Sequence, residues 1–151
     1  MNAHRLAVGL SLALALVSAG ACARENGQCA PQVRAGWVRL VPGGMPMHAG
    51  FGRIENACAA PATIVSASSP SYGSVMLHES RLVNGMSQMR MLRELRIAPD
   101  DAAVLKPGGL HLMLMEPTSA LKPGSHVAIE FTLKDGRHVL GDFEVKSAAA
   151  P

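Results

Sequence analysis

Short stretches in which apolar and polar residues alternate run through most of the chain, and no segment shows a sustained helical period. Alternation with a period of two is typical of strands that bury one face. It predicts strands over residues 33–41, 50–55, 63–68, 74–78, 88–92, 95–97, 110–115, 127–133 and 138–145. Turns rich in glycine and proline separate them, which favours an all-β sandwich or barrel.

Two dipeptides, Asn84-Gly85 and Asp135-Gly136, predict tight β-hairpins, because residues in two-residue hairpin turns need a positive φ. The first of these turns bears on the chemistry of the chain. Its hairpin would fold Met89 back towards His78.

The first 23 residues are predicted to be a signal peptide. Arg5 precedes an apolar stretch over residues 6–17 that is too short to span a bilayer, and small residues follow it. Cys22 comes after Ala-Gly-Ala, which resembles a lipoprotein box except that Ala19 stands where leucine is usual. We therefore expect export, membrane attachment only if Cys22 is lipidated, and a single domain over residues 24–151.

The charge balance and the known catalytic motifs exclude several functional classes. The chain has 14 Lys+Arg against 11 Asp+Glu, without runs of basic residues or interleaved aromatics, so a nucleic-acid partner is not expected. G-x-S-x-G, H-E-x-x-H and P-loop motifs do not occur in the sequence. We therefore expect a binding protein and not an enzyme.

Once Cys22 is removed or lipidated, Cys29 and Cys58 remain as an even pair, as expected for an exported protein in an oxidising compartment. A bridge between them would stabilise the fold by about 3–4 kcal/mol on the chain-entropy model. The alternative is a thiolate metal site. We favour the disulfide, because neither cysteine has a second Cys or a His at metal-binding spacing.

The segment Leu110-His111-Leu112-Met113-Leu114 carries candidate metal chemistry. As a strand it places three leucines on one face, suited to a core, and His111 with Met113 on the other, which should therefore look outward. Imidazole and thioether are ligands that suit a soft cation such as Cu(I). His78 and Met89 would complete a four-ligand site from elsewhere. Taken singly, each His or Met is more simply read as a satisfied polar residue or as core filler.

These four residues have the spacing H-x10-M-x21-H-x-M, and at them the chain resembles the PCu(A)C-type periplasmic copper chaperones. The similarity extends to the segments around the motif and to others along the chain after the leader: 77–79, 89–91, 105–114, 37–39, 67–70 and 121–124. The resemblance implies a cupredoxin-like, Greek-key β-sandwich in the periplasm. It also implies that His78, Met89, His111 and Met113 bind Cu(I).

The resemblance further implies delivery of the Cu(I) to an acceptor protein, such as cytochrome c oxidase subunit II or another copper chaperone, for assembly of the oxidase copper site. Two alternatives remain open: a periplasmic protein that scavenges or stores copper, and a metal-free interaction module of the envelope. Met45-Pro46-Met47-His48 is a second His/Met cluster on a predicted loop. It is either an auxiliary copper contact or, as we favour, an apolar loop tip that covers one end of the fold.

Overall fold

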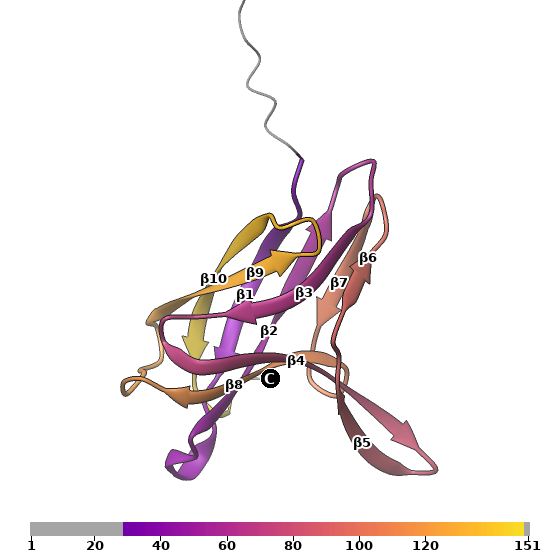
Figure 1. Cartoon of the computed structure of the whole chain (residues 1–151). Coiled ribbons are helices and arrows are strands. Elements are labelled where there is room, and N and C mark those ends of the chain that lie inside the picture. The colour runs from indigo at the N-terminus through magenta and orange to yellow at the C-terminus, as the bar shows by residue number, and fades with distance from the viewer. Residues whose placement is uncertain (1–28, 150–151) are drawn as a thin grey trace, which may run out of the picture.

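The computed structural model describes residues 29–149, which form ten strands and one short 3-10 turn (Figure 1). In chain order these are β1 (Gln32–Arg39), η1 (Pro42–Gly44), β2 (Met47–Asn56), β3 (Ala62–Ser68), β4 (Tyr72–Val83), β5 (Met86–Met91), β6 (Leu95–Ile97), β7 (Asp101–Leu105), β8 (Leu110–Pro117), β9 (His126–Leu133) and β10 (His138–Lys146). The described part of the chain has no α-helix, and none of its helical structure is long and apolar enough to cross a membrane.

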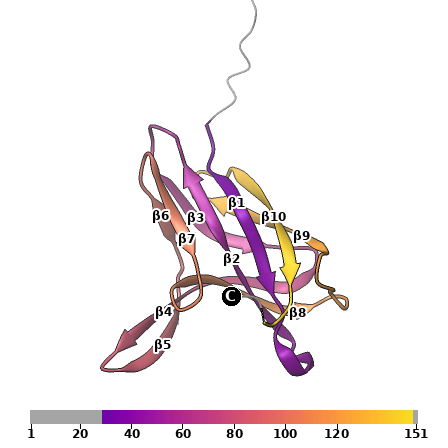
Figure 2. The ribbon, with the colours of Figure 1, turned by 180° about the vertical axis from the view of Figure 1, so that it is seen from behind.

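The strands form one sheet that closes on itself. β4, β8, β2, β1, β10, β9 and β3 are paired in that order, and Ala67 on β3 pairs with Val75 on β4 to complete the ring. β1 runs parallel to β10, whereas β2, β8 and β4 pair with antiparallel neighbours in the ring (Figure 2). The all-β prediction is confirmed, with a barrel-like closure. The cupredoxin-like, Greek-key arrangement stays a prediction.

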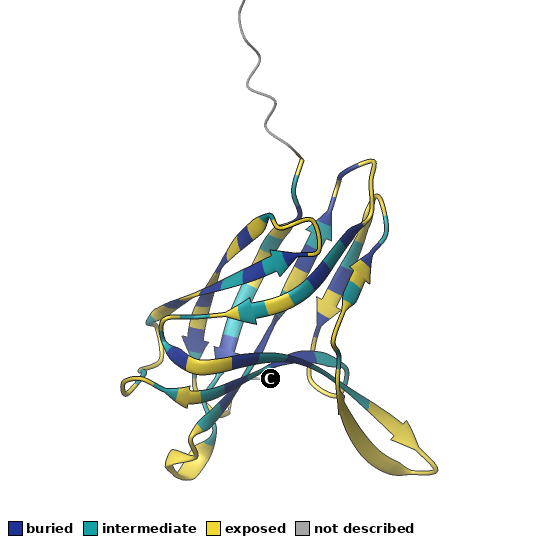
Figure 3. Cartoon of the chain, in the orientation of Figure 1, coloured by how far each residue is buried: buried dark blue, intermediate teal, exposed yellow. Residues whose placement is uncertain are grey.

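Alternation along the strands places the aliphatic and aromatic core inside this barrel. On β9, buried residues at every second position contribute Val127, Ile129, Phe131 and Leu133, and β10 adds further buried residues in the same way. The intervening positions are mostly more exposed, so the burial colours alternate along these strands in Figure 3. Removing this apolar surface from water is the main force that holds the barrel together.

Most predicted strands are observed within one to three residues of their expected ends, and the strand over residues 95–97 is observed as predicted. Two expectations were wrong. β7 was not predicted, because its Asp101-Ala102-Ala103 start has low strand propensity. β4 was predicted to end at His78, yet it continues to Val83, because its last five residues pair with β5 in a projecting hairpin arm.

Both predicted hairpins are observed, but only the first has a two-residue turn, since β9 ends at Leu133 and β10 begins at His138. Asn84 and Gly85 have φ values of 52° and 78°, as a two-residue turn with two left-handed residues requires. This turn fixes Val83 opposite Met86, and with it the register of the whole β4–β5 arm. Gly136, with φ of 87°, lies in the turn that joins β9 to β10.

The predicted disulfide between Cys29 and Cys58 is also confirmed, with Cα atoms 5.6 Å apart. It ties the start of the described chain to the segment that follows β2. In Figure 1 this is the end of the barrel away from the β4–β5 arm. The predicted signal peptide and Cys22 lie outside the described residues.

Candidate metal centre

Strand register brings the two motif histidines together. On β4, His78 lies directly opposite His111 on β8, and their ring centroids are 5.9 Å apart. On its other side His78 lies opposite Met91 on β5. Opposed residues in an antiparallel pair share a face of the sheet, so the two imidazoles project on the same side. That side faces away from the barrel core, because Leu77 and Leu112, the neighbours of these histidines, are buried inside it.

His111 is oriented by a hydrogen bond that leaves its other nitrogen free. Its Nδ1 lies 2.9 Å from the carbonyl oxygen of Gly109 and donates to it. Nε2 therefore carries the lone pair, which is the arrangement typical of a metal-binding imidazole. His111 lies on the outward face, as predicted, yet only 7% of it is accessible. Its face is outward, but the His78 ring and the turn before β8 lie close against it.

His78 has one nitrogen in contact with sulfur and one without a partner. Its Nδ1 lies 3.1 Å from the Sδ of Met89, while its Nε2 is buried and makes no hydrogen bond. A buried polar atom of this kind costs folding free energy unless something binds it. Burial, and secondarily the positive charge of a protonated His111, lowers the pKa of His78. Both effects favour the neutral imidazole that a metal ion requires.

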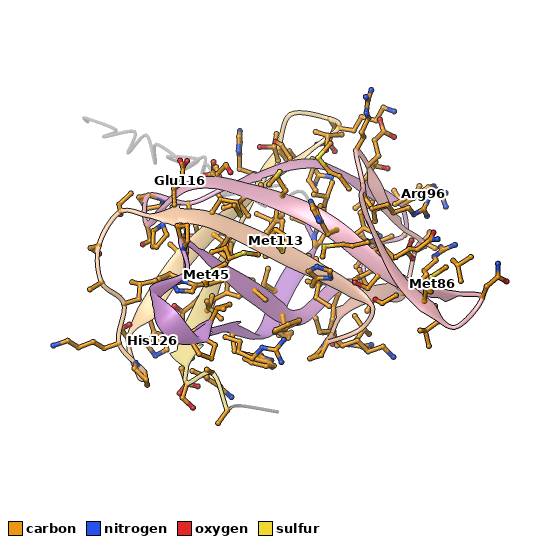
Figure 4. All side chains as sticks on the ribbon, turned by 90° about the horizontal axis from the view of Figure 1, so that it is seen from below. Met45, Met86, Arg96, Met113, Glu116 and His126 are labelled. Atoms are coloured by element: carbon orange, nitrogen blue, oxygen red, sulfur yellow. A yellow bond between two sulfur atoms is a disulfide. The ribbon has the colours of Figure 1, made fainter. Side chains whose placement is uncertain are left out.

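The two motif methionines are placed differently from each other. Met89 lies on β5 opposite Ser80, diagonal to His78, and is 54% exposed. Met113 lies on β8 opposite Met76, two residues beyond His111 on the same face, and is half-buried. Figure 4 labels Met113 on β8, with Met45 on one side of it and Met86, at the tip of the arm, on the other. Strand pairing therefore places all four motif residues on one face of β5, β4 and β8.

Any metal site on this face needs thioether sulfur. Within residues 29–149, no three His, Cys, Asp or Glu side chains gather closely enough to hold a metal ion. The two described cysteines are joined in the disulfide and offer no thiolate. The donors that remain are imidazole nitrogen and methionine sulfur, which suit a soft cation.

A cluster of charges holds the arm on its opposite face. Glu79 lies opposite Arg90, and its carboxylate accepts hydrogen bonds from Arg90 and Arg81 at 2.8–3.0 Å. The hydrogen bond from Arg81 and then that from Arg90 lower the pKa of Glu79. Because Glu79 alternates with His78, these charges point away from the histidines. The cluster joins β5 to β4 and so helps to position Met89.

The structure also corrects the interpretation of the Met45–His48 segment. β2 begins at Met47, so Met47 and His48 lie in a strand and not in a loop. His48 is only 8% exposed and lies opposite Leu114 on the core side, with its Nδ1 3.0 Å from the Tyr72 hydroxyl. Burial lowers the pKa of His48 and raises that of Tyr72 to about 12. His48 thus lies on the opposite face from the motif histidines.

Sequence reasoning placed Met91 on the same face as Met89, but it missed the pairing of Met91 with His78 and the contact of the Gly109 carbonyl with His111. The Asn84-Gly85 turn could have identified the pairing of Met91, because a two-residue hairpin that pairs residue 83 with residue 86 also pairs residue 78 with residue 91. The Gly109 carbonyl could not have been found in this way, because its contact with His111 depends on how the turn before β8 folds.

Comparison with known proteins identifies the family of the chain. Residues 32–145 match the family model described as "Putative lipoprotein LpqE-like". The chain belongs to this LpqE-like family of PCu(A)C-type proteins. A relative described as "Putative lipoprotein Lxx21020", from Leifsonia xyli subsp. xyli, is 33% identical over 106 residues. That alignment covers 70% of this chain and 63% of the relative, so the chain matches less than two thirds of the relative's length.

Solved structures with the same fold include two proteins that hold copper. The Cu(I) form of DR1885 from Deinococcus radiodurans is 29% identical, with a TM-score of 0.62, over 83% of this chain and 85% of that one. The copper-bound PCuAC domain from PmoF2 has a TM-score of 0.62 at 16% identity, over 76% of this chain and 91% of that one. At 16% identity the PmoF2 domain supports the fold alone.

Proposed function

We propose that this protein binds one Cu(I) through His78, Met89, His111 and Met113 and delivers it to an acceptor protein outside the cytoplasm. The observation that carries the proposal is the convergence of His78, Met89 and His111, with Nε2 of His78 buried and unpaired. A soft cation at this place would take up the lone pairs of the neutral imidazoles. The Cu(I) form of the 29% identical DR1885 supports the choice of metal.

The donor set explains why copper would be both held and released. Thioethers need no deprotonation and, unlike cysteine thiols, are not consumed by disulfide formation in an oxidising compartment. Two imidazoles and two thioethers are neutral, so the bound site would keep the +1 charge of the ion. An acceptor with thiolates is a stronger donor to Cu(I) and can displace these ligands in turn. No electron is transferred in such an exchange.

Because the β4–β5 arm is exposed, an acceptor can begin to displace the copper ligands there. All of β5 is exposed, including Met89, whereas His111 is only 7% accessible. We infer that Met89 leaves the copper first and His111 last. The family resemblance supports the periplasm as the location, anchoring through Cys22 if that residue is lipidated, and the copper site of cytochrome c oxidase as the destination.

The test is a competition titration against a colorimetric Cu(I) chelator, combined with X-ray absorption of the reduced copper form. We expect one Cu(I) per chain that competes with the chelator, with both nitrogen and sulfur neighbours. His111→Ala and Met113→Ala should weaken binding strongly, whereas Met86→Leu, at the 63% exposed arm tip, is the matched control and should not. A spectrum fitted by nitrogen and oxygen alone would contradict the proposed ligands.

Mixing the copper form with a reduced dithiol acceptor domain separates the remaining alternatives. Movement of copper to the acceptor supports delivery. Copper that stays on this protein would indicate storage or scavenging instead. A folded protein that binds no Cu(I) would leave the metal-free interaction module as the better explanation.

A further inference from the structure

Four methionines occupy neighbouring positions on the outward face of β2, β8 and β4. Met47 on β2 is directly opposite Met115 on β8, and Met113, two residues away on β8, is directly opposite Met76 on β4. Directly opposed side chains in an antiparallel pair have Cβ atoms about 4.5–5.5 Å apart. We call Met47, Met115, Met113 and Met76 the methionine row.

The methionine row does not fill the core. Leu112 and Leu114, which alternate with the methionines of β8, are fully buried, whereas all four members of the row are half-buried on the other face. The outward face of an antiparallel sheet is ordinarily polar. Here the positions instead carry thioether sulfur within reach of solvent, so the packing of the barrel does not account for them.

The row is continuous with the candidate metal centre. Met113 belongs to both, since His111 lies two residues before it on the same face of β8. On its β2 side Met113 lies opposite Ala49, which adds only a methyl group to this face. Met47 and Met115 thus lie one step beyond Met113, on the side away from the histidines.

We propose that Met47, Met115 and Met113 form a second site, for a soft monovalent cation such as Cu(I) or Ag(I), held only by thioether sulfur. Neutral thioethers select soft cations. In this site they would bind more weakly than a set that includes two imidazoles, so an ion that arrives here moves on to His78 and His111. Met113 stays bound during the exchange, while the imidazole nitrogens replace the other two sulfurs and the ion keeps its +1 charge.

Only the direction of transfer rests on the proposed function. The test uses the mature chain labelled with 13C at the methionine methyl groups and titrated with Ag(I), which does not change oxidation state. In a second sample labelled with 15N, the first equivalent should shift the ring nitrogen signals of His78 and His111. Because the first ion then occupies Met113, the second equivalent is held chiefly by the opposed pair Met47 and Met115, and it should shift their methyl signals and leave those of the arm-tip Met86 unchanged.

Matched variants decide the assignment. The double variant Met47→Leu/Met115→Leu should lose the second equivalent and keep the affinity of the first within about threefold. Met86→Leu should retain both equivalents. Leucine conserves side-chain volume well enough for the fold to persist, which methyl dispersion would verify.

Three results would overturn the second site: saturation at one equivalent, equal shifts at Met86, or retention of the second equivalent by the double variant. A different result would contradict the proposed centre at His78 and His111. In that case the histidine signals would not move, while the Met47 and Met115 signals would still report on the methionine row.

Discussion

Replacing His78 by leucine should make the copper-free protein more stable while it destroys copper binding. Nε2 of His78 is buried without a hydrogen bond, and its Nδ1 has only the weakly accepting Met89 sulfur at 3.1 Å. Leucine has no polar atom to desolvate and fits a strand position. The substitution removes the unpaired group without creating another, because the one partner of His78, the weakly accepting Met89 sulfur, belongs to a residue that is 54% exposed.

The size of the effect follows from the cost of the unpaired atom. Burying a hydrogen-bonding group without a partner costs about 1–3 kcal/mol. The His78 side chain as a whole is half-buried, so we expect the unfolding free energy to rise by an amount near the lower end of this range, about 1–1.5 kcal/mol. With a urea m-value of roughly 1.5 kcal/mol/M, the unfolding midpoint should rise by about 0.7–1 M.

The assay is urea unfolding of the copper-free protein at about pH 7.5, well above the reference histidine pKa, where the lowered pKa of His78 keeps it neutral. His111→Leu should be less stable than the parent, because that substitution removes the hydrogen bond to Gly109. Met86→Leu should leave the unfolding free energy unchanged within about 0.5 kcal/mol. An unchanged or lower midpoint for His78→Leu would refute the reasoning.

Three further predictions concern the disulfide, pH and metal selectivity. Replacing Cys29 and Cys58 by serine opens a loop with a sequence separation of 29 and should lower the unfolding free energy by about 3.5 kcal/mol in urea titrations. Copper affinity should survive that change, and its loss would mean that the far end of the barrel shapes the site. Cu(I) affinity should fall as pH drops from about 7 towards 5, because protons compete for the imidazole nitrogens. Burial, and then the charge of His111, lowers the pKa of His78, so its share of the loss begins at lower pH than for a free imidazole. The unfolded chain takes up this proton more readily than the folded one, so the stability of the copper-free protein should also fall below about pH 6.5. Met89→Leu should keep the pH slope of copper binding at reduced affinity, and a flat chelator-competition profile would remove the histidines from the site. At the proposed centre Ag(I) should displace Cu(I) one for one, whereas Zn2+ should not compete, because the two imidazoles and two thioethers include no anionic ligand. Comparable Zn2+ binding by calorimetry would contradict this neutral ligand set.

The local sequence pattern was sufficient to predict those structural features that depend on residues close together in the chain. The alternation in residues 110–114 correctly placed Leu112 and Leu114 in the core and His111 with Met113 on the other face. The Asn84-Gly85 dipeptide correctly predicted a hairpin, because few other residue pairs adopt two consecutive positive φ angles at low cost. Cys29 and Cys58, which are the two cysteines after the predicted signal peptide, likewise sufficed to predict the disulfide.

The same local pattern could not tell how much of each face is covered. His111 lies on the outward face, yet it is buried, with the His78 ring centroid 5.9 Å from its own and its Nδ1 bonded to the Gly109 carbonyl. His48 looked like part of a loop, but pairing with β8 turns it inward against Tyr72. β7 was overlooked for a related reason, since its pairing with β2 stabilises a segment whose own residues favour strands only weakly.

By itself, then, the sequence determined the all-β class, the hairpin, the disulfide and the four residues of the motif, because each rests on spacing or on the conformational preference of adjacent residues. Only the tertiary structure decided that the sheet closes on itself, that Nε2 of His78 has no partner, and that Met47 and Met115 meet beside Met113. These features depend on which strands pair and in which register. Register is set by burial and by turns across the whole barrel, which no single segment of the chain contains.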